Sequence, residues 1–110
     1  MDKGSVNLDR ATVDSVIVYL HQVLVKYGID DNHIALFGSF NNGNTHEDSD
    51  IDLIIISQHF EGKDIFERIN MVVKPELEVM RKFVVPMDIL QKTPAEYEDT
   101  QVTFNSKIII

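Results

Sequence analysis

The segment 50–56, Asp-Ile-Asp-Leu-Ile-Ile-Ile, constrains the fold more than any other part of the chain. From residue 53 onward it is apolar on both faces, which is typical of a strand in the interior of a sheet. Because side chains alternate along a strand, Asp50 and Asp52 share one face at its start. Two ionised carboxylates held this close repel one another unless a cation joins them. The segment is therefore either a solvated acidic loop before a strand or a metal site.

The residues before this strand predict a helix followed by a second strand. Asn7 or Asp9 is suited to cap the helix, and Gly28 is suited to end it in a left-handed conformation. Residues 33–37 are apolar and predict a short strand that runs into Gly38. The helix is expected to have one apolar stripe with the spacing i, i+3, i+4, i+7, made of Val13, Val16, Ile17, Leu20, Val23, Leu24 and Tyr27.

The residues after the acidic strand predict a helix over 63–82, a strand over 83–90 and a short final helix. Pro75 predicts a kink, or a fresh start with proline at the first helical position. Pro86 cannot donate to a ladder, so the strand is expected at a sheet edge. Thr-Pro-Ala-Glu at 93–96 reads as a capping box that starts the final helix. One side of the first of these helices carries Ile65, Phe66, Ile69 and Val73.

The order α-β-β-α-β-α predicts an α/β (α+β) fold, a small mixed sheet flanked by helices, and residues 1–110 are expected to form a single domain. The chain has no cysteine, and its start has no apolar region typical of a secretory signal, so we expect a cytoplasmic protein. No apolar stretch is long enough to cross a membrane. The net charge of -8 argues against binding to a nucleic-acid backbone, although a nucleotide carried with Mg²⁺ remains compatible.

A third carboxylate lies in the predicted edge strand. Asp88 is a lone acid among apolar residues, and a charge there is costly unless it is paired or bound to a metal. If the two strands are neighbours, Asp88 completes a cluster with Asp50 and Asp52. Taken alone, Asp88 is equally well explained as an aspartate in solvent at the end of a strand.

Gly38 and Ser39 follow the first predicted strand. A glycine there lets a phosphate approach the backbone, and the amides of the next turn and the Ser39 hydroxyl are suited to hold it. A Gly-Ser pair after a strand is usually only a turn. Together with Asp50 and Asp52, however, it describes a phosphate cradle that faces a metal site.

The chain has a spaced motif that resembles the signature of the nucleotidyltransferase superfamily, which includes DNA polymerase β and kanamycin nucleotidyltransferase. The motif consists of Gly38-Ser39, ten further residues, and then Asp50-Ile51-Asp52. The chain looks most like the minimal nucleotidyltransferases, and the similarity covers most of it. The resemblance implies Gly38 and Ser39 as nucleotide-binding residues. It implies Asp50, Asp52 and Asp88 as catalytic and metal-binding residues.

The resemblance also implies the reaction. Two Mg²⁺ ions, or Mn²⁺, would bind at Asp50 and Asp52, and Asp88 would orient the second ion or take the acceptor proton. A nucleoside monophosphate, AMP from ATP, would pass to a hydroxyl acceptor. Because the chain offers no room for a separate acceptor domain, the resemblance implies an acceptor on another chain. In this family that chain is often a helical HEPN-domain toxin, which is AMPylated by its antitoxin.

Two further interpretations stay open. The family usually places Arg or Lys soon after the Gly-Ser pair, whereas this chain has Phe-Asn-Asn-Gly at 40–43. Lys63, Arg68 or Lys74 are the candidates to replace that cation. A module that keeps the fold and acts only by binding a partner is therefore the second hypothesis. An antibiotic-modifying nucleotidyltransferase is a weaker third, since such enzymes carry a second domain.

The chain ends in three isoleucines at 108–110. Apolar residues at a terminus are rarely left in water. They either pack on the core, join an interface, or end where a longer native chain was cut. An interface would be that of a homodimer or of a complex with another protein.

Overall fold

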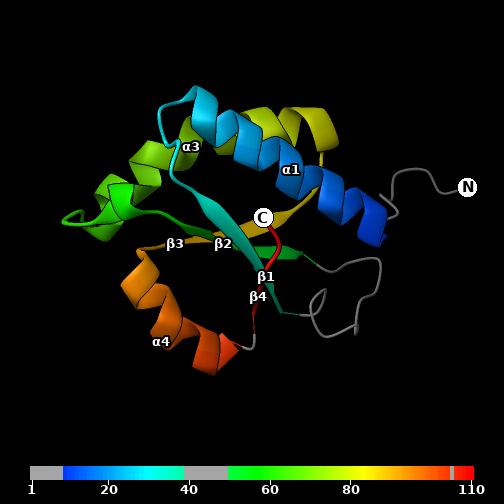
Figure 1. The fold of residues 1–110 in the computed structure, drawn as a ribbon. Helices are drawn as coiled ribbons and strands as arrows, with labels where there is room; N and C mark the ends of the chain where they lie inside the picture. Colours follow the sequence, from blue (N-terminus) through cyan, green and yellow to red (C-terminus); the bar gives the residue numbers. More distant parts are fainter. Residues whose placement is uncertain (1–8, 39–49, 105) are drawn as a thin grey trace, which may run out of the picture.

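A four-stranded mixed sheet lies at the centre of the protein, with strand order β3-β2-β1-β4 (Figure 1). The structure, a computed structural model, describes residues 9–38, 50–104 and 106–110. The strands are β1 (His33–Phe37), β2 (Ile51–Ile56), β3 (Met87–Lys92) and β4 (Lys107–Ile108). β1 is antiparallel to both β2 and β4, whereas β2 and β3 are parallel. The predicted class, a small mixed sheet flanked by helices, is confirmed.

Helices cover both faces of the sheet. α1 (Arg10–Lys26) and α3 (Ile65–Phe83) lie on one face, and α4 (Pro94–Phe104) lies on the other (Figure 1). A short 3-10 turn, η1 (Gln58–Phe60), links β2 to the segment before α3. None of the helices formed by the described residues is long and apolar enough to cross a membrane.

α1 follows the prediction closely. Asp9 is the N-cap, and its Oδ1 accepts a hydrogen bond of 2.9 Å from the Thr12 amide. Gly28 follows the helix with φ of 93°. Tyr27 caps the helix and is 41% exposed, so it is not part of the buried stripe. The other six residues predicted for that stripe are buried: Val13, Val16, Ile17, Leu20, Val23 and Leu24. Asn7 lies outside the described residues.

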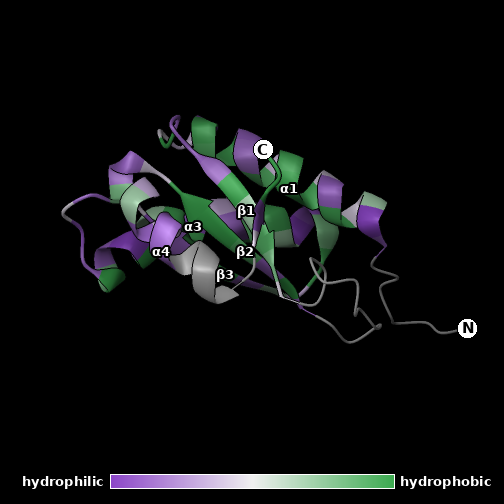
Figure 2. Cartoon of the chain, turned by 60° about the horizontal axis from the view of Figure 1, so that its bottom comes forward, coloured by the Kyte–Doolittle hydropathy of each residue, from purple (hydrophilic) through white to green (hydrophobic). Residues whose placement is uncertain are grey.

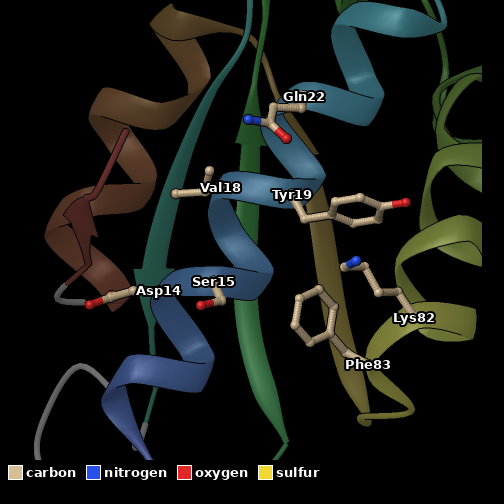
Figure 3. Close-up of a pocket in the computed structure, with 7 residues that line it drawn as sticks. All are labelled: Asp14, Ser15, Val18, Tyr19, Gln22, Lys82 and Phe83. Carbon is tan, nitrogen blue, oxygen red and sulfur yellow. The ribbon is translucent and has the colours of Figure 1, made fainter.

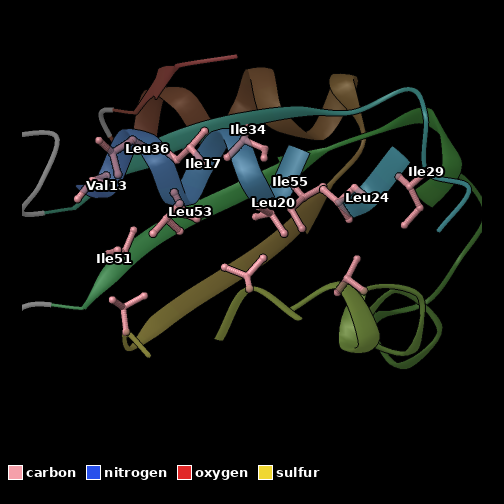
Figure 4. Packing of buried hydrophobic residues seen from close by; sticks show 14 of the residues in the cluster. Val13, Ile17, Leu20, Leu24, Ile29, Ile34, Leu36, Ile51, Leu53 and Ile55 are labelled. Atoms are coloured by element: carbon pink, nitrogen blue, oxygen red, sulfur yellow. The ribbon is translucent and has the colours of Figure 1, made fainter. Parts of the chain in front are cut away.

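β2 is an interior strand, as its apolar sequence predicts. It pairs with β1 on one side and β3 on the other, and it is coloured as apolar over most of its length in Figure 2. Ile51, Leu53 and Ile55 point into the main core between the sheet and α1 and α3 (Figure 4). Ile54 and Ile56 point to the opposite face, where they pack with Tyr97 of α4.

α3 is one continuous helix through Pro75, so the predicted fresh start at this proline is wrong. Its start is set by a capping box at Asp64. The Glu67 amide donates to Asp64 Oδ1 and the Asp64 amide donates to Glu67 Oε1, each over 2.8 Å. Pro75 is buried and is accommodated without ending the helix.

The side of α3 that faces the core differs from the side whose apolar residues stand out in the sequence. Val72, Pro75 and Val79 are the buried residues of α3. The residues Ile65, Phe66, Ile69 and Val73 share one side, as predicted, but that side is exposed to solvent.

β3 begins four residues later than predicted. Phe83 is the last residue of α3, and Val84 caps that helix in a left-handed conformation with φ of 50°. Pro86 precedes the strand, where its carbonyl accepts a hydrogen bond of 3.0 Å from the Ile51 amide. The edge position of β3 is confirmed.

The C-terminal part of the chain adds one strand to the predicted order. α4 begins with the predicted capping box, in which the Thr93 amide donates to Glu96 Oε1 over 3.0 Å and the Glu96 amide donates to Thr93 Oγ1 over 3.2 Å. β4 then pairs with β1. Ile109 and Ile110 are partly buried against the main core, which is the first of the three interpretations of the terminal isoleucines.

Candidate functional site

Asp52 and Asp88 lie side by side on the parallel strands β2 and β3, as partners in the register of the pair. Register partners on neighbouring strands project from the same face of a sheet. Asp50 is two residues before Asp52, so the alternation of the strand directs it to this face as well. The three predicted carboxylates therefore share one face, and we call them the acidic shelf.

The acidic shelf lies on the α4 face of the sheet, at the end that α4 leaves uncovered. Further along this face, Ala35, Ile54 and Ile56 pack against Tyr97 of α4. At the shelf, Asp52 is half-buried, and Asp50 and Asp88 are exposed. A ligand from solvent therefore has access to all three side chains.

Asp52 lies where its negative charge is costly. Burial, followed by the charges of Asp88 and Asp50, raises the pKa of the Asp52 carboxyl. Both neighbours act on it through their negative charge, which shows that the shelf concentrates like charge. A divalent cation at this place would relieve the repulsion.

Gly38, at the end of β1, lies against the carboxylate of Asp52. Its φ is 76°, a conformation that residues with a Cβ rarely adopt. A Cβ at this position would overlap Asp52 Oδ2 and lie 3.0 Å from Asp52 Cγ. The structure shows that the glycine admits the Asp52 carboxylate, and its contact with a phosphate stays a prediction. Ser39, the other predicted nucleotide-binding residue, lies outside the described residues.

The donor set of the shelf suits a hard divalent cation that keeps other ligands. In the described part of the chain, no three carboxylates or imidazoles are gathered tightly enough to hold a metal ion by themselves. Mg²⁺ usually binds through one or two protein carboxylates together with water and substrate phosphates. The acidic shelf fits this way of binding Mg²⁺, because Asp52 is half-buried and Asp50 and Asp88 are exposed on the same face. The shelf does not fit a closed site made of protein ligands alone.

Arg68 is not available to the shelf. Its Nη1 and Nη2 donate to the two carboxylate oxygens of Glu96 over 2.6 and 3.2 Å, and its Nε donates to the Lys63 carbonyl over 2.9 Å. Lys63, Arg68 and Gln91 line a hollow at the C-terminal end of β3, whereas Asp88 lies at the N-terminal end of this strand. The ion pair with Glu96 instead joins α3 to α4.

Lys74 also lies away from the shelf. It borders a hollow with Tyr27 and Arg81 on the α1 and α3 side of the sheet. None of the three cations considered as replacements for the family's basic residue therefore reaches Asp52. The segment 40–43, where that basic residue is absent, lies outside the described residues.

A larger open cavity lies elsewhere, between α1 and the end of α3 (Figure 3). Its volume is about 560 Å³, and its walls include Tyr19, Lys82 and Phe83. Lys82 Nζ is 5.0 Å from the centre of the Tyr19 ring and 6.0 Å from that of Phe83. This cavity has none of the shelf carboxylates, so its size does not make it the candidate site.

The sequence profile of the nucleotidyltransferase domain family matches residues 19–110. This range contains the acidic shelf and all four strands. The chain belongs to the nucleotidyltransferase domain family. No curated protein sequence matches the chain closely.

Solved structures similar to the chain agree with the fold of this family. A candidate nucleotidyltransferase from Sulfolobus solfataricus has a TM-score of 0.58 at 17% identity, over 93% of this chain and 88% of the other. A second candidate nucleotidyltransferase has a TM-score of 0.55 at 23% identity, over 81% and 91%. A toxin–antitoxin solved with AMP-PNP has a TM-score of 0.55 at 21% identity, over 86% and 70%. At these identities the likeness shows the fold.

Two features of this nucleotidyltransferase-family chain could not be found by motif. The first is the close approach of Asp52 to Gly38, which joins residues on two strands. The second is Phe37, the register partner of Asp52 on β1, which lies beside the shelf. The alternation of side chains over 33–37 predicts on which face of the strand Phe37 lies. Only the strand pairing shows that its neighbour is Asp52.

Proposed function

We propose that this chain transfers the nucleoside monophosphate of a Mg²⁺-bound nucleoside triphosphate, ATP, to a hydroxyl group on a partner protein. The observation that carries the proposal is the register of Asp52 with Asp88, since it brings together carboxylates that are 36 positions apart in the sequence. The family match supports nucleotidyl transfer as the class of reaction. The acidic shelf supports the metal dependence, because burial and the charges of Asp88 and Asp50 raise the pKa of Asp52 and a cation would relieve that repulsion.

Each residue of the site has a proposed role. Asp50 and Asp52 would hold two Mg²⁺ ions, or Mn²⁺, which supply charge neutralisation at the phosphates and at the attacking and leaving oxygens. Gly38 and Ser39 would bind the triphosphate. Asp88 is exposed on the edge strand, where a partner has access, and it would accept the proton of the acceptor hydroxyl as the oxygen attacks the α-phosphorus and pyrophosphate leaves.

The partner proposed is a helical HEPN-type toxin, and the acceptor is a side-chain hydroxyl of that protein. The support is the similarity to a toxin–antitoxin solved with AMP-PNP, which is an analogue of ATP. The chain would then act as the antitoxin and AMPylate its partner in the cytoplasm.

A second candidate function is binding without transfer. It is favoured by the positions of Lys63, Arg68 and Lys74, none of which supplies the shelf with a cation for the phosphates. In that case the fold would neutralise a partner by contact alone.

Labelled ATP separates the two candidates. The chain would be incubated with Mg²⁺, the product of the adjacent gene, and ATP labelled either at the α-phosphate or at the γ-phosphate. Nucleotidyl transfer predicts label on the partner from α-labelled ATP and none from γ-labelled ATP. A partner that binds the chain and receives neither label would establish the second candidate.

Two variants control the assay. Asp52→Asn should abolish transfer, because it removes the central carboxylate of the shelf. Asp99→Asn removes an exposed aspartate on α4 and should leave transfer unchanged. Equal labelling by both variants would show that the acidic shelf is not the site of transfer.

A further inference from the structure

An exposed apolar stripe runs along α3. Phe66, Ile69, Val73, Leu77 and Met80 are spaced by three, four, four and three residues, so they lie on one side of the helix. Phe66 is 74% exposed, and the other four are between 41% and 45% exposed. Val84, which caps the helix, extends the stripe by one more turn. We call these six residues the α3 stripe.

The fold already uses the other sides of α3. Val72 and Val79 face the sheet, and Glu78 is joined to α1 by the Lys26 ammonium, whose Nζ lies 2.6 Å from Glu78 Oε1. The α3 stripe is on the side that remains. Contiguous apolar surface of this kind on a soluble protein marks an interaction site, because water contact with so many apolar side chains is unfavourable.

Positive charge borders the α3 stripe. Lys74 and Arg81 are exposed and seven residues apart, so they lie on one flank, each next to a stripe residue in sequence. With Tyr27, Leu77 and Glu78, whose carboxylate is paired with Lys26, they line a hollow of about 390 Å³. Within the described ranges, no carboxylate is paired with either cation. In a chain with a net charge of -8, this flank is a local positive rim.

We propose that the α3 stripe is the docking surface for an amphipathic helix of a partner protein, with acidic side chains along the flank that meets Lys74 and Arg81. Apolar anchors at helical spacing are the usual way in which a helix recognises another helix. Carboxylates opposite Lys74 and Arg81 would fix the orientation and select against other partners.

The same charges disfavour a second copy of this chain as the occupant. In an antiparallel pair of α3 helices related by a two-fold axis, each flank lies beside its own counterpart. Lys74 and Arg81 of one copy would face the same two cations of the other, which is repulsive. An acidic partner meets no such penalty.

The α3 stripe ends close in sequence to the start of β3, the strand that carries Asp88, although α3 and the acidic shelf lie on opposite faces of the sheet. Val84 is four residues before Asp88, and a chain of that length spans at most about 14 Å. A helix docked on the stripe would therefore reach the end of the sheet where Asp88 lies. The docking surface itself does not depend on transfer, so it is tested without nucleotide.

Two synthetic amphipathic peptides with the same apolar positions test the proposal. One carries Glu and the other carries Lys along a single flank, and binding of each is followed by fluorescence anisotropy. The acidic peptide should bind at least about tenfold more tightly than the basic one. Lys74→Glu combined with Arg81→Glu should reverse that preference, whereas Lys107→Glu, a charge reversal on β4, should not.

Matched truncations locate the contact. Leu77→Ser should weaken binding of the acidic peptide about tenfold, and Val18→Ser should leave it unchanged. Leu77 is 45% exposed and Val18, on α1, is 43% exposed, so both variants should stay folded by circular dichroism. Failure of both peptides to bind, or equal binding of the two, would overturn the proposal. So would a wild-type dimer in light scattering that Leu77→Ser converts to a monomer, because the stripe would then be covered by a second copy.

Discussion

Asp52 and Asp88 are register partners on adjacent parallel strands, and both project from the face of the sheet that carries α4. The pair joins the acidic start of the interior strand to a lone carboxylate on the edge strand. Like charges placed directly opposite one another destabilise a sheet. The proposed metal site would offset this cost, and the first prediction follows from the cost itself.

Replacement of Asp52 by Asn should leave the ligand-free protein as stable as the wild type or more stable. The change keeps the shape of the side chain and removes a charge that burial, Asp88 and Asp50 all disfavour. The expected gain is up to about 1 kcal/mol, measured by urea unfolding without metal. A clear loss of stability would indicate that the Asp52 carboxylate has a structural role.

Gly38→Ala should destabilise the protein more than Gly28→Ala. Both glycines have positive φ, so both substitutions carry a backbone cost of about 1 kcal/mol. Only at Gly38 does the new Cβ also overlap Asp52, since nothing lies within 4 Å of a Cβ at Gly28. In an Asp52→Ala background the difference between the two glycine substitutions in thermal unfolding should shrink, and what remains is due to the Cβ of residue 52, which would lie 3.2 Å from the new Cβ. An unchanged difference between them would refute the Gly38–Asp52 contact.

Glu76 should make the protein less stable at neutral pH than at mildly acidic pH. Burial raises the pKa of this α3 carboxyl from 4.5 to about 7. The folded protein then holds a proton that the unfolded chain releases, so stability is full below pH 4.5 and falls as the pH rises to about 7. Since Glu76 is only half-buried, we expect a loss of about 1–2 kcal/mol.

Glu76→Gln should remove this loss. Its urea midpoint should exceed that of the wild type above about pH 7 and approach it near pH 4.5. Glu98→Gln, at an exposed position of α4, is the matched control and should not change the pH profile. A profile for Glu76→Gln parallel to that of the wild type would contradict the prediction.

The Arg68–Glu96 ion pair should contribute stability that is lost in acid. Arg68, followed by the Thr93 amide, lowers the pKa of Glu96 to about 2. The contribution is complete above pH 4.5 and disappears as the pH falls toward 2, because the carboxylate takes up a proton. Glu96→Gln should cost about 1 kcal/mol near neutral pH, since Glu96 is partly exposed and also caps α4.

The Arg10–Asp14 pair is the control for this measurement. Both of its side chains are about half exposed, so Asp14→Asn should cost only a few tenths of a kcal/mol. Equal losses for the two pairs would show that the link between α3 and α4 adds nothing to an ordinary surface ion pair.

The interior of the fold was predictable because its signals are local. The apolar run of β2 predicts that this strand is buried, and the apolar stripe of α1 predicts which side of this helix is buried. The orientation of α3 was harder to predict, because this helix has apolar residues on two sides. Val79 faces the sheet and Phe66 faces solvent. The spacing of apolar residues within the helix does not indicate which of its two apolar sides packs against the sheet.

The start of β3 was missed for a related reason. Residues 83–86 are largely apolar, as in a strand, yet Phe83 completes α3 and Val84 takes the left-handed conformation that glycine usually takes at a helix end. At the site, the alternation of β2 predicts the common face of Asp50 and Asp52. The register of Asp88 and the approach of Gly38 depend on pairing between distant segments, which only the structure gives.

Calorimetric titration with ATP tests the central claim, that the acidic shelf binds a nucleotide through a divalent metal ion. The wild type should bind ATP with Mg²⁺ and show no binding in EDTA, and Asp52→Asn should not bind under either condition. Mg²⁺–ATP at a hundredfold excess over its dissociation constant should then stabilise the wild type by about 2.7 kcal/mol and leave Asp52→Asn unchanged. Binding of Mg²⁺–ATP to Asp50→Asn and Asp52→Asn with the wild-type affinity would contradict the account.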